Sequence, residues 1–392
     1  MKKVIAFLLL VSFLVSSCAP GQMFGPTLTP TATSTNTPTP TPTFTPTPPP
    51  TNTPIPTPTE YPFSKLPGWF AYMDFDCQGL CTNISIIKPD LSERKLLTNH
   101  DYGLVMSITW SPNAQYIAYQ FIVLGESGGL QLRLFDLKTN TMSTLTSKYI
   151  EPVSGLSWSP DSRYLVIGYQ NESNKSGTIQ RIDIQSHQIT NLTKDLISQN
   201  VVPVWSPDGK TIAFSSENSE GNNIWLMDAN GNNLRNVTAE NKIRSLFPSW
   251  SPDGNEIAFY QQDTENNTEL WVMKADGSDP NMVYKLGKAS VIETPVWSLD
   301  GNRIGIIYGD TDKSDVTIFV VGTGDVMNIS EKGRKYTALS WSPDSNALIY
   351  MGKEGEAKRI IYLFVFDGED PFTVSGETAM DMTIWSPIAD IP

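Results

Sequence analysis

Short apolar runs alternate with short polar segments along most of the chain, and this pattern predicts β-strands joined by tight turns. One polar segment, Trp205-Ser206-Pro207-Asp208-Gly209, shows the arrangement, since an apolar run at 201–204 precedes it and another at 211–214 follows it. Proline fixes φ for a type I turn, aspartate bonds back to the local backbone, and glycine accepts the left-handed conformation. The segment therefore predicts a strand, a tight turn and a second strand.

The same turn segment recurs along the chain, and its spacing predicts the fold. Its tryptophans lie 44 to 48 residues apart, and they are Trp110, Trp158, Trp205, Trp250, Trp297, Trp341 and Trp385. A period of about 40 to 50 residues is typical of the four-stranded blades of a β-propeller. The 330 residues that follow position 62 therefore predict an all-β, seven-bladed β-propeller, with six blades as the main alternative.

Three of the turns lack the glycine, and Ala114, Ser162 and Ser345 stand in its place. Each of these residues has a Cβ atom, so we expect these turns to be slightly strained or differently shaped. We interpret the repeated tryptophan and aspartate as packing and turn residues, because a residue that every blade needs serves the fold rather than the chemistry.

The two ends of the repeat region are out of phase with the repeat. The region opens with residues 69–72, which read as the second strand of a blade, and closes with residues 382–385, which read as a first strand without followers. A strand from the C-terminal end is therefore predicted to complete a blade whose other three strands come from the N-terminal end. This closure leaves no unpaired sheet edge at the seam.

The N-terminal segment has the pattern of an export signal. Lys2 and Lys3 precede an apolar stretch at 4–15, and Ser16-Ser17-Cys18 follows. This ending resembles a bacterial lipoprotein signal, which implies cleavage after residue 17 and lipidation of Cys18. The alternative is an ordinary secreted protein in which Cys18 carries no lipid. We expect a protein of the bacterial cell envelope, on its extracytoplasmic side, that meets the membrane through the N-terminal lipid only.

A segment rich in threonine and proline follows the predicted signal, and residues 37–42 alternate the two residue types. Such a segment has few apolar side chains to bury and favours an extended polyproline conformation. We interpret it as a stalk, with a proline-rich ligand for an aromatic groove as the alternative. The predicted order is a signal peptide at 1–17, the lipidated cysteine and stalk at 18–62, and the β-propeller at 63–392.

Two further cysteines lie close together, at Cys77 and Cys81, and no fourth cysteine is present. In an exported protein such a pair predicts a disulfide that closes a loop between two strands. A zinc site needs more ligands than this pair, and the chain has only two histidines, His100 and His187. We expect no metal and no cofactor.

The motif and the strands around it resemble one family of repeats. The segment 205–214 reads Trp-Ser-Pro-Asp-Gly-Lys-Thr-Ile-Ala-Phe, and 224–231 reads Ile-Trp-Leu-Met-Asp-Ala-Asn-Gly. In these segments the chain resembles the TolB-type, WD40-like (PD40) β-propeller repeat family, and the resemblance extends over about residues 69–387. The resemblance implies a propeller that binds proteins or peptides at a loop face or at the central channel. In this chain the predicted anchor and stalk take the place of the α/β domain that precedes the propeller in TolB, so the role of TolB in the envelope is not carried over.

The chain carries a net charge of −13, which disfavours nucleic acid as a partner. The loops between second and third strands are acidic, whereas the loops between blades are basic and hold two aromatic residues. In propellers both sets of loops lie on one face. We define a candidate binding face by the basic and aromatic members, which are Lys242, Arg244, Phe247, Lys285, Lys288, Arg334, Lys335 and Tyr336. It suits an acidic peptide or an anionic glycan, and the alternative is a set of solvated loop charges.

No sequence motif points to catalysis. Residues 125–129 match the G-x-S-x-G nucleophile pattern, but the segment lies between two predicted strands, and the strand-to-helix elbow that Ser127 would need is not predicted. The segments 228–232 and 276–279 begin like calcium loops but lack the distal glutamate of an EF-hand, and we interpret them as turns. We expect a monomeric, non-catalytic lipoprotein whose propeller binds a protein or peptide. The alternatives are a propeller that binds or degrades carbohydrate at the envelope and a purely structural envelope protein.

Overall fold

All secondary-structure elements that the structure describes are β-strands, as the sequence pattern predicts. In this computed structural model all described residues lie within the unit Glu60–Pro392, and none of them forms a helix that could cross a membrane. The described residues are 66–74, 81–124, 129–146, 155–170, 177–193, 202–218, 221–239, 243–291, 293–309, 313–331, 333–354, 358–366, 372–373, 380–388 and 391.

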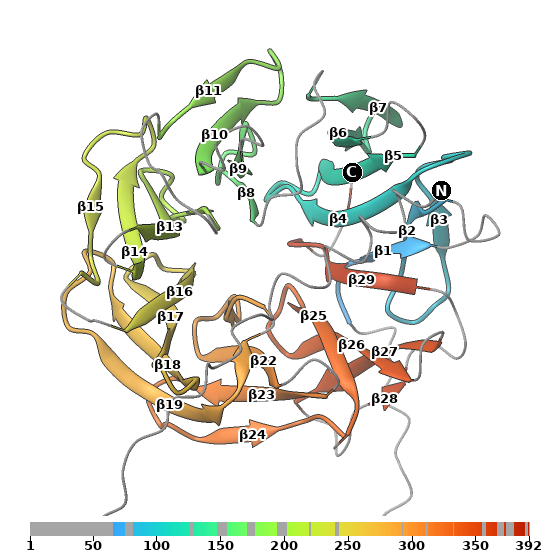
Figure 1. Ribbon diagram of the computed structural model, residues 1–392. Coiled ribbons are helices and arrows are strands. Elements are labelled where there is room, and N and C mark those ends of the chain that lie inside the picture. The colour runs from blue at the N-terminus through green and yellow to red at the C-terminus, as the bar shows by residue number, and fades with distance from the viewer. Residues whose placement is uncertain are drawn as a thin grey trace, which may run out of the picture. The chain divides into compact units, whose positions relative to one another are not determined.

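The described strands form seven antiparallel sheets around a common centre, as the seven-bladed prediction requires (Figure 1). We number the sheets as blades 1 to 7. Blade 1 holds β4 (Leu104–Trp110), β5 (Tyr116–Val123), β6 (Gly129–Asp136) and β7 (Thr141–Thr144). Blade 2 holds β8 (Leu156–Trp158), β9 (Tyr164–Gln170), β10 (Gly177–Asp183) and β11 (Ile189–Asn191). Blade 3 holds β12 (Val204–Trp205), β13 (Thr211–Asn218), β14 (Gly221–Asp228) and β15 (Arg235–Asn236).

The remaining blades follow the same order, with one extra strand in blade 5. Blade 4 holds β16 (Arg244–Trp250), β17 (Glu256–Gln262), β18 (Asn267–Lys274) and β19 (Asn281–Lys288). Blade 5 holds β20 (Ser290–Val291), β21 (Val296–Trp297), β22 (Arg303–Gly309), β23 (Ser314–Val320) and β24 (Val326–Asn328). Blade 6 holds β25 (Lys335–Trp341), β26 (Ala347–Glu354), β27 (Lys358–Val365) and β28 (Phe372–Thr373). Blade 7 holds β29 (Met380–Trp385), β1 (Phe70–Asp74), β2 (Asn83–Ile87) and β3 (Arg94–Leu96).

Blade 7 is closed by strands from both ends of the repeat region, which confirms the predicted closure (Figure 1). The register of β29 on β1 places Trp385 opposite Phe70, and the two rings meet edge to face at 4.6 Å. Ser386 fixes the seam further, because its Oγ accepts the Trp69 N–H at 3.0 Å and its own N–H donates to the Trp69 carbonyl at 2.8 Å.

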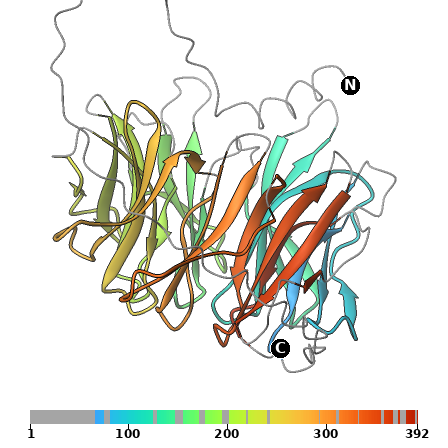
Figure 2. The same cartoon turned by 90° about the horizontal axis from the view of Figure 1, so that it is seen from below.

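The core consists of apolar layers that lie between neighbouring blades. In the described part of the chain there are seven such layers, one for each pair of adjacent blades around the ring. In the layer between blades 3 and 4, for example, Ile224 and Leu226 pack against Ile257 and Phe259. Each blade therefore buries apolar side chains on both of its surfaces, and the side view in Figure 2 shows the blades standing beside one another.

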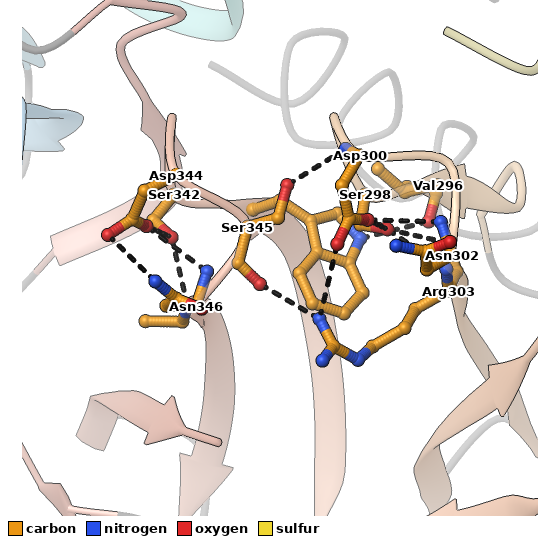
Figure 3. A network of polar contacts seen from close by, with 11 residues as sticks. Val296, Ser298, Asp300, Asn302, Arg303, Ser342, Asp344, Ser345 and Asn346 are labelled. Carbon is orange, nitrogen blue, oxygen red and sulfur yellow. Dashed lines mark hydrogen bonds and ion pairs between the residues drawn. The ribbon is translucent and has the colours of Figure 1, made fainter. Parts of the chain in front are cut away.

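Serine and aspartate in the repeated motif build the turn between the first and second strands. In blade 5, Ser298 Oγ donates to Asp300 Oδ1 at 2.5 Å and accepts the Arg303 N–H at 2.9 Å (Figure 3). Asp300 Oδ1 also accepts the Asn302 N–H at 3.0 Å. Blades 1, 2, 3, 4 and 6 repeat these bonds, with Asn113 in place of aspartate in blade 1. The motif is thus a turn-building device, as we inferred from its presence in every blade.

The tryptophan of the motif is hydrogen-bonded to the previous blade in four of the seven blades. In these four its indole N–H donates to the carbonyl that precedes the tryptophan of the previous blade. The pairs are Trp110 to Ile384 at 3.4 Å, Trp250 to Val204 at 3.3 Å, Trp297 to Ser249 at 3.2 Å and Trp341 to Val296 at 3.0 Å. In blades 2 and 3 the indole N–H groups of Trp158 and Trp205 are buried and have no acceptor among the described residues.

The residues that replace glycine in the turn adopt left-handed backbone conformations, as expected for strained positions. The φ angles of Ala114, Ser162 and Ser345 are 53°, 60° and 61°, against 69° for Gly209. The two serines use their hydroxyl groups to bind the previous blade, since Ser162 Oγ accepts the Asn113 N–H at 3.1 Å and Ser345 Oγ accepts the Asp300 N–H at 3.0 Å (Figure 3). This hydrogen bond offsets part of the backbone strain.

Deletion of residues 380–392 tests the closure. The deletion removes β29, exposes the edge of β1 and opens the apolar layers of blade 7. We expect the melting temperature of the whole propeller to fall by well over about 10 °C, because burial of Trp385 alone is worth about 3–5 kcal/mol. The measurement is thermal unfolding followed by circular dichroism. An unchanged melting curve would show that the ring does not depend on this strand.

Protonation of the buried His100 is expected to lower the stability of the fold in acid. The side chain is buried against Phe121 with ring centroids 4.3 Å apart, and burial together with the nearby Arg133 charge lowers its pKa to about 4. The unfolded chain has a pKa near 6.5, so the neutral form stabilises the fold fully above pH 6.5, and this stabilisation is lost as the pH falls from 6.5 toward 4.

We therefore expect chemical denaturation at pH 5 to show about 2 kcal/mol less stability from His100 than at pH 7. The change His100→Gln should remove this part of the pH dependence. The control is His187→Asn, which replaces the other histidine of the chain, and it should keep the dependence. Equal pH dependence in the wild-type protein and in His100→Gln would refute the assignment.

Candidate functional site

The two faces of the propeller are built from different connections. The turns of the repeated motif and the hairpins between third and fourth strands lie at one end of every blade, which we call the motif face. The connections between second and third strands and between blades lie at the other end, which we call the loop face. The motif face repeats from blade to blade, whereas the loop face differs in each blade and is where the candidate binding face was predicted.

Arg244 begins the inner strand β16 at the loop face and is exposed. Its Nη1 donates to Gln262 Oε1 at 3.3 Å, and with the Asn222 amide turned so that its oxygen faces the guanidinium, Nε and Nη2 donate to that oxygen at 3.1 Å each. Asn222 belongs to blade 3 and Gln262 to blade 4. Neutral amides therefore hold the guanidinium, and none of the described carboxylates lies within 4.0 Å of it. Its positive charge remains available to a ligand.

Three buried polar side chains lie toward the loop-face ends of strands in blades 3 and 4, the two blades that hold Arg244 and its Asn222 partner. Ser216 in β13, Ser245 in β16 and Gln261 in β17 are each at most 2 % exposed. Ser216 Oγ, Ser245 Oγ and Gln261 Nε2 have no hydrogen-bond partner among the described residues. A buried polar group without a partner costs about 1–3 kcal/mol unless a water molecule or a ligand satisfies it. We name Ser216, Asn222, Arg244, Ser245, Gln261 and Gln262 the loop-face polar cluster.

Phe247 lies three residues into β16 and is half-buried rather than displayed. The register of β16 on β17 shifts between Leu246 and Ser249, and Phe247 has a φ of 56° within this bulge. Its ring packs against the apolar layer between blades 4 and 5. A bulge bends its strand and redirects side chains, so the position of Phe247 serves the shape of the inner strand.

The two lysines of the candidate binding face in blade 4, Lys285 and Lys288, lie on its outermost strand, β19, away from the inner strand that carries Arg244. Lys285 Nζ is 3.6 Å from a carboxylate oxygen of Glu269, so its charge is partly neutralised. Lys288 is exposed at the loop-face end of the strand, opposite Asn267. These lysines belong to the rim of the loop face rather than to the channel mouth.

Three residues of the candidate binding face lie at the start of β25 in blade 6. Arg334 Nε pairs with a Glu331 carboxylate oxygen at 3.0 Å, and its Nη1 donates to the Tyr362 hydroxyl. Lys335 is half-buried as the first residue of β25.

Tyr336, the third residue of this group, is fully buried, and its ring meets those of Tyr350 and Tyr362 at 5.4 Å and 5.8 Å. Burial raises the pKa of Tyr336 to about 12. The expectation that Tyr336 is displayed is therefore wrong, since it packs in the layer between blades 5 and 6.

One acidic side chain near the inner strands has a structural explanation. The Glu293 carboxylate accepts the N–H groups of Ala338 at 2.7 Å and Leu339 at 3.4 Å, where the register of β25 shifts. Burial raises its pKa despite these two bonds. Both oxygens therefore serve the bulge in the neighbouring blade. The described residues contain no group of three histidine, cysteine, aspartate or glutamate side chains that could hold a metal ion.

Several predicted residues lie outside the described part of the chain. They are Cys18, Cys77, Ser127 and Lys242. Cys81 is buried and disulfide-bonded, and its pairing with Cys77 stays a prediction. The segments 228–232 and 276–279 are ordinary turns, in which Asp228 and Asp276 accept backbone N–H groups at 2.8 Å from Asn230 and Ser278.

The comparisons with known proteins identify the family of the fold. The family model described as the TolB beta propeller domain, PD40, matches residues 82–278, which is half of the chain. The chain therefore belongs to the TolB β-propeller (PD40) family. A second family model, described as eukaryotic translation initiation factor eIF2A, matches residues 259–358, about a quarter of the chain. No curated protein matches the chain.

Solved structures support the same fold at low sequence identity. TolB from Acinetobacter baumannii is 18 % identical with a TM-score of 0.52, and the match covers 81 % of this chain and 66 % of TolB, just under two thirds of its length. An oligogalacturonate lyase from Vibrio parahaemolyticus is 13 % identical with a TM-score of 0.58, over 77 % of this chain and 91 % of the lyase. A prolyl endopeptidase is 12 % identical with a TM-score of 0.62, over 83 % and 50 %. These likenesses concern the propeller fold, which carries unrelated functions.

Proposed function

We propose that this chain is a lipid-anchored envelope lipoprotein whose propeller binds a protein or peptide through the loop face, with Arg244 as the anchor. The observation that carries the proposal is the exposed guanidinium held by Asn222 and Gln262 without a described carboxylate partner. An arginine fixed by neutral amides is preorganised for a carboxylate, and arginine is enriched among the residues that dominate interfaces.

The other residues of the loop-face polar cluster lie at the same end of the blades as Arg244. The buried donors of Ser216, Ser245 and Gln261 lie at the same end of blades 3 and 4 as Arg244. The acidic side chains of the neighbouring loop, such as Asp263, accept backbone N–H groups of their own turn and do not compete for Arg244. We infer an acidic segment of the partner as the ligand. Membership of the TolB propeller family agrees with protein binding in general.

The proposal assigns no reaction to the chain. Glu293, a half-buried acid in the connection between β20 and β21, is occupied by two backbone N–H groups. Glu293 therefore has no oxygen free to act as the base that covalent catalysis requires. The segment that resembles a nucleophile motif lies between the strands β5 and β6, and no helix follows it among the described residues.

The lipid anchor and the stalk are inferred from the sequence alone. The lipoprotein-like ending at Cys18 and the threonine- and proline-rich residues that follow it support a tether between membrane and propeller. Labelling of cells with a palmitate analogue should mark the wild-type protein and leave Cys18→Ser unmarked. Equal labelling of both proteins would contradict the anchor.

Charge reversal at Arg244 tests the binding face. We expect Arg244→Glu to weaken capture of partner proteins from envelope extract by the full chain at least about tenfold, because it removes a charge-assisted pair and adds repulsion. The capture should also weaken with salt. Quantitative mass spectrometry of the captured proteins provides the measurement.

The matched control for this test is Lys274→Glu, which makes the same charge change in the same blade. Lys274 ends β18 at the motif face and is exposed. Its capture profile should equal that of the wild-type protein. Loss of capture in both variants, or in neither, would exclude Arg244 as the anchor.

A further inference from the structure

A pocket lies on the motif face between blades 2 and 3, on the opposite side of the propeller from Arg244. Its volume is about 400 Å³, within the range of small-molecule sites. The lining includes Asp161, Tyr164 and Arg181 from blade 2 and Trp205, Asp208 and Asn230 from blade 3. The pocket is therefore formed where two of the repeated turns meet.

Arg181 distinguishes this junction from the others. The register of β10 on β9 pairs Arg181 with Val166, the second residue beyond the turn-proximal end of β9. In each of the other six blades the equivalent residue is aliphatic. These residues are Ile86, Leu134, Leu226, Val272, Ile318 and Leu363. A charged side chain thus occupies a position that elsewhere packs between blades.

The Arg181 side chain spans the junction and keeps part of its hydrogen-bonding capacity. Nη1 donates to the Ala229 carbonyl at 2.7 Å and to Asn230 Oδ1 at 3.1 Å, and the guanidinium lies 4.8 Å from the centre of the Tyr164 ring. These bonds fix its position. Among the described residues Nε and Nη2 have no partner, and no carboxylate lies within 4.0 Å. Their N–H groups remain as donors for a ligand.

Acceptors lie in the same pocket. Oδ1 of Asp161 accepts the Ser159 hydroxyl at 2.5 Å and the Arg163 N–H at 3.0 Å, so the carboxylate is fixed in place while its second oxygen has no described partner. Asp208 is fixed in the same way and also pairs with Lys210 at 3.2 Å. The lining holds one positive charge, that of Arg181, and two negative charges, those of Asp161 and Asp208, the second of which pairs with Lys210 outside the lining. Donors and acceptors therefore lie side by side in the pocket.

Gly209 leaves one further donor unused. At the junctions of blades 1 with 2 and 5 with 6, a serine hydroxyl in the glycine position accepts the N–H of the preceding turn. The residue in that position here is Gly209, so no hydroxyl reaches the Asp161 N–H, and no other acceptor for it is present among the described residues. A ligand oxygen can take the place that a serine hydroxyl has in the other two junctions.

We infer that this pocket binds an uncharged saccharide. Neighbouring hydroxyl groups of a sugar both donate and accept, which matches the guanidinium and amide donors beside the Asp161 carboxylate. Trp205 is buried in the apolar layer between blades 2 and 3, and the Tyr164 ring has the guanidinium groups of Arg163 and Arg181 at 5.0 Å and 4.8 Å, so hydrogen bonds rather than ring stacking would hold the sugar. An acidic peptide would meet two aspartates and a basic one would meet Arg181, so this mixture of charges favours a neutral ligand. This site is independent of the proposed function of the loop face.

The test measures binding of methyl α-glucoside, cellobiose and N,N′-diacetylchitobiose to the full chain by saturation-transfer NMR and titration calorimetry. We expect at least one of them to bind, and Arg181→Leu, which restores the residue type of the other blades, to weaken it about tenfold. Gly209→Ser should weaken it severalfold, because the new hydroxyl takes the Asp161 N–H. Its Cβ would lie 3.4 Å from Pro160 Cδ, an ordinary contact.

A matched control makes the same glycine change two blades further on. Gly301→Ser places a Cβ 3.9 Å from Pro252 Cδ, outside this pocket, and should leave saccharide binding unchanged, as should Arg244→Glu. The inference is overturned if none of the saccharides binds, if binding survives Arg181→Leu in a folded protein, or if the peptide acetyl-Glu-Ala-amide binds in their place. Failure at this site would leave the loop-face proposal untouched, since each has its own variants.

Discussion

The junction between adjacent blades is the interaction on which the rest of the structure depends. An apolar layer lies between each pair of neighbouring blades, and in four blades the motif tryptophan also donates its indole N–H to the inner strand of the previous blade. Burial of apolar area supplies most of the stabilisation, and the indole bond fixes how one blade sits against the next. Because β29 pairs with β1, strands from the two ends of the repeat region close the ring, and every blade has a neighbour on both sides.

This construction divides the work between the two faces. The motif face repeats its serine, aspartate and tryptophan bonds from blade to blade, so most of its polar groups are already satisfied. Toward the loop face one bond also recurs in five blades, from an N–H of the third strand to a threonine or serine hydroxyl after the fourth strand, whereas the other polar residues at this end vary among the blades. Arg244 and the buried donors of Ser216, Ser245 and Gln261 belong to this variable end, which is where binding residues are expected on a rigid scaffold. The pocket at Arg181 is a local exception on the motif face.

Much of the fold could be predicted from sequence because the motif is local. The period, the closure by residues near 385 and the left-handed turns at Ser162 and Ser345 follow from turn chemistry and strand order. The site could be predicted only in part. Sequence places Arg244 and Tyr336 equally near the starts of inner strands, yet the first is exposed and the second is buried, because burial depends on which side of a strand faces the neighbouring blade.

The loop-face polar cluster left a signal that sequence analysis missed. The second strand of blade 1 ends in the apolar residues Phe121 and Ile122, whereas the equivalent strand of blade 4 ends in Gln261 and Gln262. Comparison of strand ends among the blades could have found it. The contacts of Lys285 with Glu269 could not be found in this way, because a bulge in β18 and β19 sets their register.

Native-state hydrogen exchange tests most directly whether the blades of the closed ring depend on one another for stability. If each blade is held by its two neighbours and the seam is sealed, the buried amides of β5, β13, β17, β22 and β26 should all exchange with one shared free energy, that of global unfolding. Equal denaturant dependence across these five strands is the expected result. Exchange of one blade at a much lower free energy, while the others stay protected, would contradict cooperative unfolding of the ring.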